Sequence, residues 1–214
     1  MDSALTFCSH IREKIISARK GIGTIRYMSK YVSRDVLDQM YKLYVWPHLD
    51  YGDIIYHKFD LDLISVFTRK LESTQYAAAL AVSGAWRGTN RQKLFDELGW
   101  ELLYHRRWYR HLTHFYKLRQ SKSPEYLYNL IPPENSPKYD LRHVHVFEQP
   151  VEKTNRFSNI YFQNCPNEWN KLDLSIQSSQ NVSEFKRKLV QLVRPSKNSI
   201  FGIHDIIGTK LPET

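Results

Sequence analysis

The stretch that decides the fold reads Thr74-Gln-Tyr-Ala-Ala-Ala-Leu-Ala-Val-Ser-Gly-Ala-Trp-Arg-Gly-Thr-Asn-Arg91. Its alanines predict a helix that packs closely against a neighbour, because small side chains let two helix axes approach. A loop containing Trp86-Arg87-Gly88 follows, and Asn90 or Thr89 is a candidate N-cap for a short helix that Gly99 ends. The chain is therefore expected to be mainly α, a bundle of packed helices.

A further helix around His105-Arg-Arg-Trp-Tyr-Arg110 has two chemically different faces when residues are placed about 100° apart. The apolar face comprises Leu102, His105, Trp108, Tyr109, Leu112, Phe115 and Tyr116. The opposite face comprises Arg106, Arg107, Arg110, His111, His114 and Lys117. Most charge runs are simply solvated, but Glu101 is the only carboxylate nearby in the sequence. We therefore interpret this face as a basic ridge that neutralises phosphates.

A second basic stripe is predicted on the first helix. Apolar residues recur there at helical spacing, namely Ile11, Ile15, Ala18, Ile22 and Ile25. Arg12, Arg19 and Arg26 stand seven residues apart on another face. Gly21 and Gly23 weaken the helix and predict either a break or close backbone packing at this point.

Periodicity also predicts the remaining elements. Ser33 should cap a helix that ends near Pro47, with a buried stripe of Val36, Leu37, Met40, Leu43 and Tyr44. A helix over about 61–82 should bury Ile64, Phe67, Leu71, Ala78 and Val82. Residues 143–147 and 156–162 are expected to form a few short strands.

Composition shifts divide the chain into three expected parts. Residues 1–123 should form the helical bundle domain, and residues 124–182 a linker region rich in Pro and Asn with short elements. Residues 183–214 should contribute a C-terminal helix and tail, since apolar positions regain helical spacing there. The part beyond the bundle is expected to be a less regular extension.

Charge and cysteine content limit the classes of partner. The chain has 214 residues, a net charge of +9 and 42% hydrophobic residues, which favours a folded protein with a polyanionic partner. Cys8 and Cys165 lack the spacing of a disulfide framework or a zinc site, so no metal or other cofactor is expected. No export signal or membrane-spanning run is visible, which predicts an intracellular protein, cytoplasmic or nuclear, without a membrane partner.

Several ordered motifs resemble the reverse transcriptases of non-LTR retrotransposons of the LINE type, jockey-like, downstream of the catalytic palm. They cover nearly the whole chain and read Tyr44-Val-Trp-Pro-His-Leu-Asp-Tyr-Gly-Asp53, Gly84-Ala-Trp-Arg-Gly-Thr89, Glu97-Leu-Gly-Trp-Glu101 and Glu168-Trp-Asn170. The resemblance implies a fragment comprising the thumb and the linker that follows it. In that family the thumb is helical and grips the template and primer duplex.

The resemblance also indicates what this sequence lacks. Family polymerases bind two metal ions through palm carboxylates that include an Asp-Asp pair. Tyr51-Gly52-Asp53 matches part of that motif, but Ile54 occupies the last position, so no catalytic residue is expected and the chain alone should not be an enzyme. Asp50 and Asp53 are expected to hydrogen-bond locally instead. The end of the sequence departs from the family and suggests a degenerate or truncated element copy.

The predicted function is non-catalytic binding of RNA or an RNA-DNA hybrid, with no small-molecule substrate. The predicted nucleic-acid contacts are Arg106, Arg107, Arg110, Lys117, Arg12, Arg19, Lys20, Trp86 and Arg87. Trp86 either stacks on a base or fills a gap between helices. Two alternatives stay open: an inert relic of a transposon, and a protein interaction module with an exposed aromatic surface. A reverse transcriptase palm supplied in trans is a possible partner.

Overall fold

The computed structural model describes residues 7–57, 66–120, 124–134, 146–147 and 161–193. The chain divides into two compact units, Met1–Lys171 and Leu172–Thr214. The expected helical class is confirmed, because 74% of the described part is helical and that part holds no strand. The helices of the first unit are α1 (Cys8–Met28), α2 (Arg34–Tyr44), α3 (Trp46–Asp50), α4 (Asp53–Tyr56), α5 (Val66–Ser83), α6 (Arg91–Leu98), α7 (Leu103–Arg119), α8 (Glu125–Tyr128) and α9 (Tyr161–Asn170).

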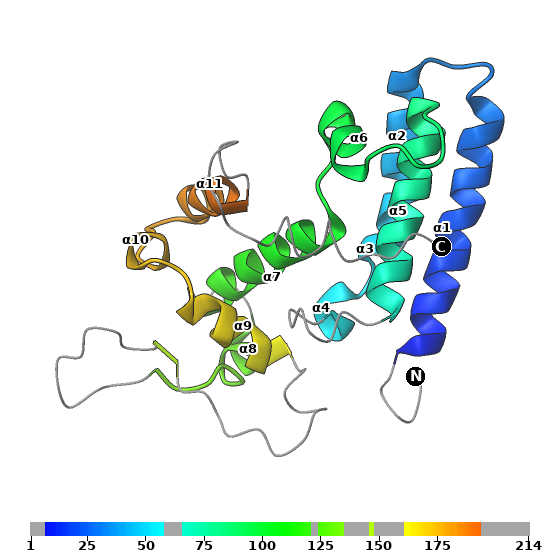
Figure 1. Ribbon diagram of the computed structural model, residues 1–214. Coiled ribbons are helices and arrows are strands. Elements are labelled where there is room, and N and C mark those ends of the chain that lie inside the picture. The colour runs from blue at the N-terminus through cyan, green and yellow to red at the C-terminus, as the bar shows by residue number, and fades with distance from the viewer. Residues whose placement is uncertain (1–6, 58–65, 121–123, 135–145, 148–160, 194–214) are drawn as a thin grey trace. The chain divides into compact units, whose positions relative to one another are not determined.

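Helix α1 buries the apolar stripe that the sequence predicts, since Ile11, Ile15, Ala18, Ile22 and Ile25 are all buried. It lies beside α5 and runs in the same direction, as Figure 1 shows. The helix continues unbroken through Gly21 and Gly23. A Cβ at Gly21 would lie 2.9 Å from the carbonyl oxygen of Tyr44, so of the two predicted outcomes close packing is the one observed.

The buried stripe of α2 differs from the prediction. Leu37 and Tyr41 are buried, and Val45 continues the stripe beyond the end of the helix. Three residues predicted to be buried are exposed instead, namely Val36, Leu43 and Tyr44. The prediction was wrong because two apolar stripes share this short helix, and spacing alone does not tell which of them faces the core.

The connection from α5 to α7 is fastened to the bundle by polar contacts. Asn90 caps α6 by accepting a hydrogen bond from the backbone N–H of Lys93 at 3.1 Å. The Trp100 ring stacks on Tyr41 with 3.7 Å between centroids, and its indole N–H donates to Asp38 at 2.8 Å. These contacts fix the point at which α7 begins.

Part of the predicted linker packs on α7. The Trp169 ring is fully buried against Phe115 and Tyr116. The Asn170 amide accepts from the backbone N–H of Phe147 and donates to its carbonyl oxygen, both at 3.1 Å. Residues after 134 therefore contribute to the same core as α7. The three-part division of the chain stays a prediction.

The expected strands are not seen in the described residues. Phe147 makes an isolated bridge with Glu134, and Tyr161 and Phe162 begin α9 rather than ending a strand. The other residues of both predicted strands lie outside the described part. The second unit contains the expected C-terminal helix, with α10 (Leu174–Gln177) and α11 (Val182–Val193).

Candidate nucleic-acid interface

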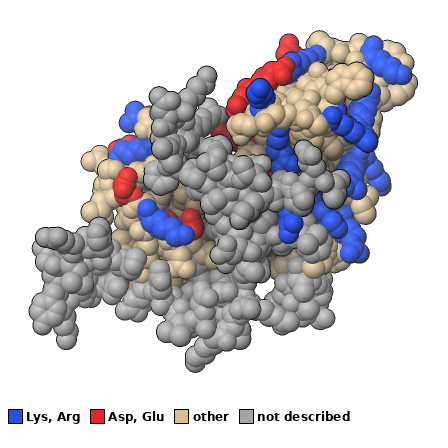
Figure 2. Space-filling model, in the orientation of Figure 1, with Lys and Arg blue, Asp and Glu red and all other residues tan. Residues whose placement is uncertain are grey.

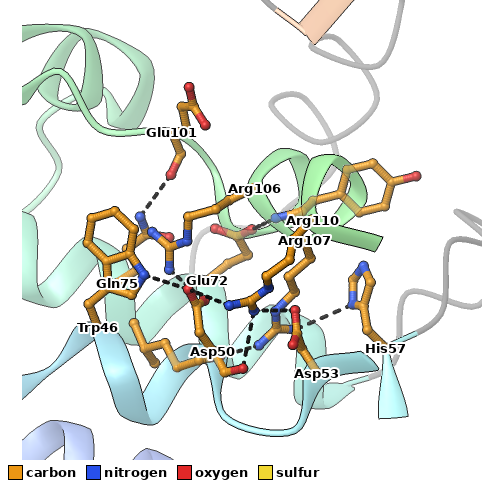
Figure 3. Close-up of polar contacts among 12 residues, drawn as sticks. Trp46, Asp50, Asp53, His57, Glu72, Gln75, Glu101, Arg106, Arg107 and Arg110 are labelled. Atoms are coloured by element: carbon orange, nitrogen blue, oxygen red, sulfur yellow. Dashed lines mark hydrogen bonds and ion pairs between the residues drawn. The ribbon is translucent and has the colours of Figure 1, made fainter. Parts of the chain in front are cut away.

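The predicted basic ridge belongs to α7, which is largely buried. Ten of its 17 residues are buried, on both of the faces that the helical wheel separates. Arg107 has 1% of its surface exposed, and the Arg106 side chain 12%. Figure 3 shows Arg106 and Arg110 beside Asp50 and Asp53, and Arg107 beside His57.

Asp50 is the carboxylate that pairs with Arg106. Its side chain is 8% exposed and lies 2.8 Å from Nη2 of Arg106 and 3.3 Å from Nη1 of Arg110. The Trp46 indole N–H also donates to Asp50, one helical turn away. The Arg106 guanidinium lies over the Trp46 ring at 4.2 Å. Burial opposes the charge of Arg106, but Tyr41 and Asp50 raise its pKa above the ordinary value, so it stays charged.

Asp53 forms the second charged contact. Gly52 precedes it in the left-handed region, and Arg110 donates to the Asp53 carboxylate. The buried His111 ring lies 3.6 Å from the same carboxylate. Burial alone would raise the pKa of Asp53, but the nearby His111 ring and the Arg110 guanidinium outweigh it and lower the pKa. Burial lowers the pKa of His111 more than Asp53 raises it, so this histidine is neutral at pH 7.

Arg107 is held by groups that carry no full charge. Its guanidinium donates to the carbonyl oxygen of Leu49, and it lies 3.4 Å from Nδ1 of His57 and from the hydroxyl of Tyr56. Glu72, on α5, is also buried and accepts the backbone N–H of Tyr104 at 3.0 Å. Burial raises the pKa of Glu72, although Arg107 and Arg106 oppose that rise.

Arg106 and Arg110 therefore pair with Asp50 and Asp53, and Arg107 is buried on the same helix; we call these three arginines the α7 arginine cluster. The prediction that Arg106 and Arg107 project from the protein as a ridge was wrong, whereas the Arg110 side chain is 37% exposed. The carboxylate partners of Arg106 and Arg110, on α3 and α4, come from 56 and 57 residues earlier in the chain. Of the predicted basic face, Lys117 alone is classed as exposed.

The local role predicted for the two aspartates was incomplete. Asp50 does bond within its own turn, to Trp46, but its charge is balanced by Arg106 and Arg110. A sequence signal for this pairing exists: Asp50 and Asp53 lie one turn apart without a basic partner in the same segment, and α7 has arginines without acidic partners. Unpaired acidic residues in one segment and unpaired basic residues in another together predict that the two segments pair in the fold.

The first helix presents the remaining arginines to solvent. Arg12, Arg19 and Arg26 are exposed, as is Lys20. None of these four forms an ion pair with another described residue. We call this surface the α1 arginine face. In Figure 2 it lies within the blue edge on the right, where α1 runs in Figure 1.

Arg26 was not among the predicted contacts, although the sequence carries its signal. It continues the seven-residue spacing of Arg12 and Arg19 and shares their solvent face. Gly23 lies between Arg19 and Arg26, and a Cβ there would meet nothing within 4 Å. The backbone of α1 is therefore open to an approaching partner in the middle of the arginine face.

Trp86 lies in the connection between α5 and α6 and is 88% exposed. It does not fill a gap between helices, so that alternative was wrong. Arg87 beside it is exposed as well, and forms no ion pair with another described residue. Trp86 and Arg87 thus keep the accessibility that a nucleic-acid contact requires.

No group of three His, Cys, Asp or Glu side chains in the described residues could hold a metal ion. Within the same residues, no helix combines the length and hydropathy needed to cross a membrane. Comparisons with protein-family models, curated proteins and solved structures give no match.

Proposed function

We propose that this chain binds the sugar-phosphate backbone of RNA or of an RNA-DNA hybrid through the α1 arginine face, as a non-catalytic part of a non-LTR reverse transcriptase. The observation that carries the proposal is the exposure of Arg12, Arg19 and Arg26 without carboxylate partners among the described residues. Arginine is a strong phosphate ligand because its planar guanidinium can donate two parallel hydrogen bonds.

The spacing of the face suits a repeating polyanion. Seven residues of α-helix advance by roughly 10 Å, which is about three nucleotide steps along a duplex axis. Lys20 adds a fourth charge to the same exposed side, and Gly23 leaves room for a backbone to approach. Contacts of this kind read no bases, so binding should be independent of sequence and sensitive to salt.

The assignment to a reverse transcriptase rests on the motif resemblance. Several of its residues hold the helices together: Trp100 on Tyr41, Asp53 on Arg110, and Asn170 on Phe147. These motif residues have a structural role in this chain, so the proposed likeness to the family concerns its helical thumb and not its active site. Without a palm Asp-Asp pair, the chain is proposed to grip nucleic acid and to perform no polymerisation.

The test is a salt series of binding to a blunt RNA-DNA hybrid, read by fluorescence anisotropy. The variant carries Arg12→Glu, Arg19→Glu and Arg26→Glu, and should weaken binding at least about tenfold at low salt. It should also reduce the slope of log affinity against log salt by roughly 2 to 3, as expected for the loss of three phosphate contacts. These positions are exposed, so the variant should keep its circular dichroism spectrum and melting profile.

A charge-matched control separates a specific surface from net charge. Arg69→Glu, Lys93→Glu and Arg187→Glu change exposed residues outside α1 that form no ion pair with another described residue, and they lower the net charge equally. This control should retain most of the affinity. Equal weakening by both variants would overturn the α1 assignment, and absence of hybrid binding by the folded wild-type chain would favour the relic or the protein interaction module.

A further inference from the structure

The connection between α5 and α6 is an ordered turn. The Thr89 hydroxyl donates to the carbonyl oxygen of Trp86 at 2.7 Å, and the Thr89 backbone N–H donates to the same oxygen at 3.2 Å. The Tyr76 hydroxyl donates to the carbonyl oxygen of Thr89 at 2.7 Å. Gly84 and Gly88 have φ values of 73° and 93°, which other residues rarely adopt. The turn is thus held by hydrogen bonds within itself and by the hydrogen bond from Tyr76 of α5.

This ordered turn holds the Trp86 ring out into solvent. At 88% exposure, Trp86 is the most exposed large hydrophobic residue of the described chain. Its backbone carbonyl closes the turn, whereas its indole has little contact with the rest of the protein. Burying a Trp is strongly favourable, so an ordered turn that presents one outward provides a rigid platform for a ligand.

Charge around the platform selects the kind of ligand. From Ser83 to Lys93 the chain carries Arg87, Arg91 and Lys93 and no carboxylate. Arg91 lies 5.3 Å from the centre of the Tyr76 ring, while Arg87 is exposed next to Trp86. A flat aromatic surface beside a basic side chain matches an unpaired nucleotide, whose base stacks and whose phosphate is bound by the cation.

A protein partner fits this surface less well. Interface centres of that kind cluster apolar and aromatic residues around the anchor. Here Arg87, Gly88 and Asn90, which follow Trp86 in the sequence, are exposed and not apolar, and the preceding Ala85 packs against the core. One isolated ring among small and basic residues can stack on a single base, which needs no surrounding apolar surface.

The position of the turn links it to the α1 arginine face. Helices α1 and α5 run side by side in the same direction, so the turn after α5 lies at the end of the bundle where α1 finishes (Figure 1). Arg26 lies in the last turn of α1. A nucleic-acid strand that follows the arginine face toward this end approaches the Trp86 turn.

From these observations we infer that Trp86 and Arg87 form a stacking site for an unpaired nucleotide adjoining the duplex bound by the α1 arginine face. The inference rests on the proposed function and adds a preference: the chain should favour a hybrid with a single-stranded extension over a blunt one. Base stacking on an aromatic side chain typically corresponds to a factor of about 5 to 100 in affinity.

The experiment compares three RNA-DNA hybrids: blunt, with a short single-stranded extension, and with an extension that lacks bases. Wild-type protein should bind the extended hybrid at least about fivefold more tightly than the other two. Trp86→Ala should abolish that preference without weakening binding of the blunt hybrid, and Trp86→Phe should keep most of it. Because Trp86 is so exposed, both variants should melt like the wild type.

The readouts separate this inference from the proposed function. Equal affinity of the wild type for all three hybrids overturns the stacking site, even if blunt binding still depends on the α1 arginine face. A preference that survives Trp86→Ala, or that the base-free extension reproduces, overturns it as well. Conversely, blunt binding that is unaffected by the α1 charge reversal refutes the proposed duplex contact while the extension ratio remains measurable.

Discussion

Two sets of arginines, each carried by a single helix, have opposite environments in this protein. In the α7 arginine cluster Arg106 and Arg110 pair with Asp50 and Asp53 and Arg107 is buried, whereas the α1 arginine face points to solvent with no carboxylate partner among the described residues. A helical wheel predicts the same exposed ridge for both. A row of arginines on a helix therefore predicts an exposed basic surface only if no carboxylates elsewhere in the chain pair with those arginines.

The energetic consequence is also opposite. Charges inside a protein are tolerated when each has a partner, and loss of one partner leaves the other buried and uncompensated. Exposed charges are solvated by water and screened by salt, so each contributes little to stability. Substitutions in the α7 arginine cluster should therefore change the free energy of unfolding strongly, whereas substitutions on the α1 arginine face should change it little and affect binding instead.

The largest expected effect tests this division directly. Asp50→Ala removes the partner of Arg106 and one partner of Arg110, and it leaves the Trp46 indole without its acceptor. We expect a loss of about 3–5 kcal/mol in the free energy of unfolding, measured by urea denaturation. Arg19→Ala on the α1 arginine face should change it by less than about 0.5 kcal/mol. Similar losses for the two variants would contradict the comparison.

The next prediction compares a buried and an exposed leucine on α2, where no charge is involved. Leu37 is 4% exposed and Leu43 is 68% exposed, although the sequence predicts both in one buried stripe. Leu37→Ala should cost about 2–4 kcal/mol, because it leaves a cavity in the hydrophobic core, whereas Leu43→Ala should stay within about 0.5 kcal/mol. Urea denaturation of the two variants decides which stripe is buried, and a larger loss for Leu43→Ala would reverse the assignment.

How far the sequence predicts this molecule depends on the range of the interaction concerned. The stripe from Ile11 to Ile25 is correctly predicted because the periodicity of one helix contains all the information needed. The fate of Arg107 is not, because its environment is set by Leu49 and His57, which are 58 and 50 residues away along the chain. A helical wheel has no access to such partners.

The same distinction holds for the candidate site. Arg12, Arg19, Lys20, Trp86 and Arg87 are accessible as their predicted role requires, and that role stays a prediction. Arg106 and Arg107 are not exposed as predicted, because Asp50 pairs with Arg106 and the Leu49 carbonyl oxygen and His57 hold Arg107. The exposed arginines of α1 follow from the spacing within one helix, whereas pairing between distant segments is found only by comparing charge patterns along the whole chain.

Acid should lower the free energy of unfolding through the buried histidines next to the α7 arginine cluster, whereas the α1 arginine face has no such histidine in its definition. Burial lowers the pKa of His57 well below 6.5, with Arg107 adding to the shift, and burial lowers the pKa of His111 despite Asp53. Below pH 6.5 the unfolded chain therefore takes up protons that the folded chain does not. As the pH is lowered below 6.5, the free energy of unfolding should therefore decrease, by up to about 1.4 kcal/mol per pH unit for each histidine.

Urea denaturation between pH 7.5 and 5 measures this slope. A variant with His57→Gln and His111→Gln should show a shallower slope over the same interval, because two of the groups that take up protons on unfolding are gone. His114 retains a smaller dependence, since burial lowers its pKa as well. Asp53 acts only at more acidic pH, because its pKa is lowered from 3.8. An unchanged slope in the double variant would contradict the neutral, buried state of both rings.

The smallest effect uses two glycines of α1 that lie on opposite sides of the helix. A methyl group at Gly21 would lie 2.9 Å from the Tyr44 carbonyl oxygen and 3.0 Å from Cγ2 of Val45, whereas one at Gly23 would meet nothing within 4 Å. Gly21→Ala should therefore destabilise the protein by about 1–3 kcal/mol, and Gly23→Ala should stabilise it by about 0.5–1 kcal/mol through helix propensity. Thermal melting distinguishes the signs. A destabilising Gly23→Ala would contradict the solvent exposure of the arginine face, because Gly23 and the arginines share it, and a stabilising Gly21→Ala would contradict the close packing on the other side.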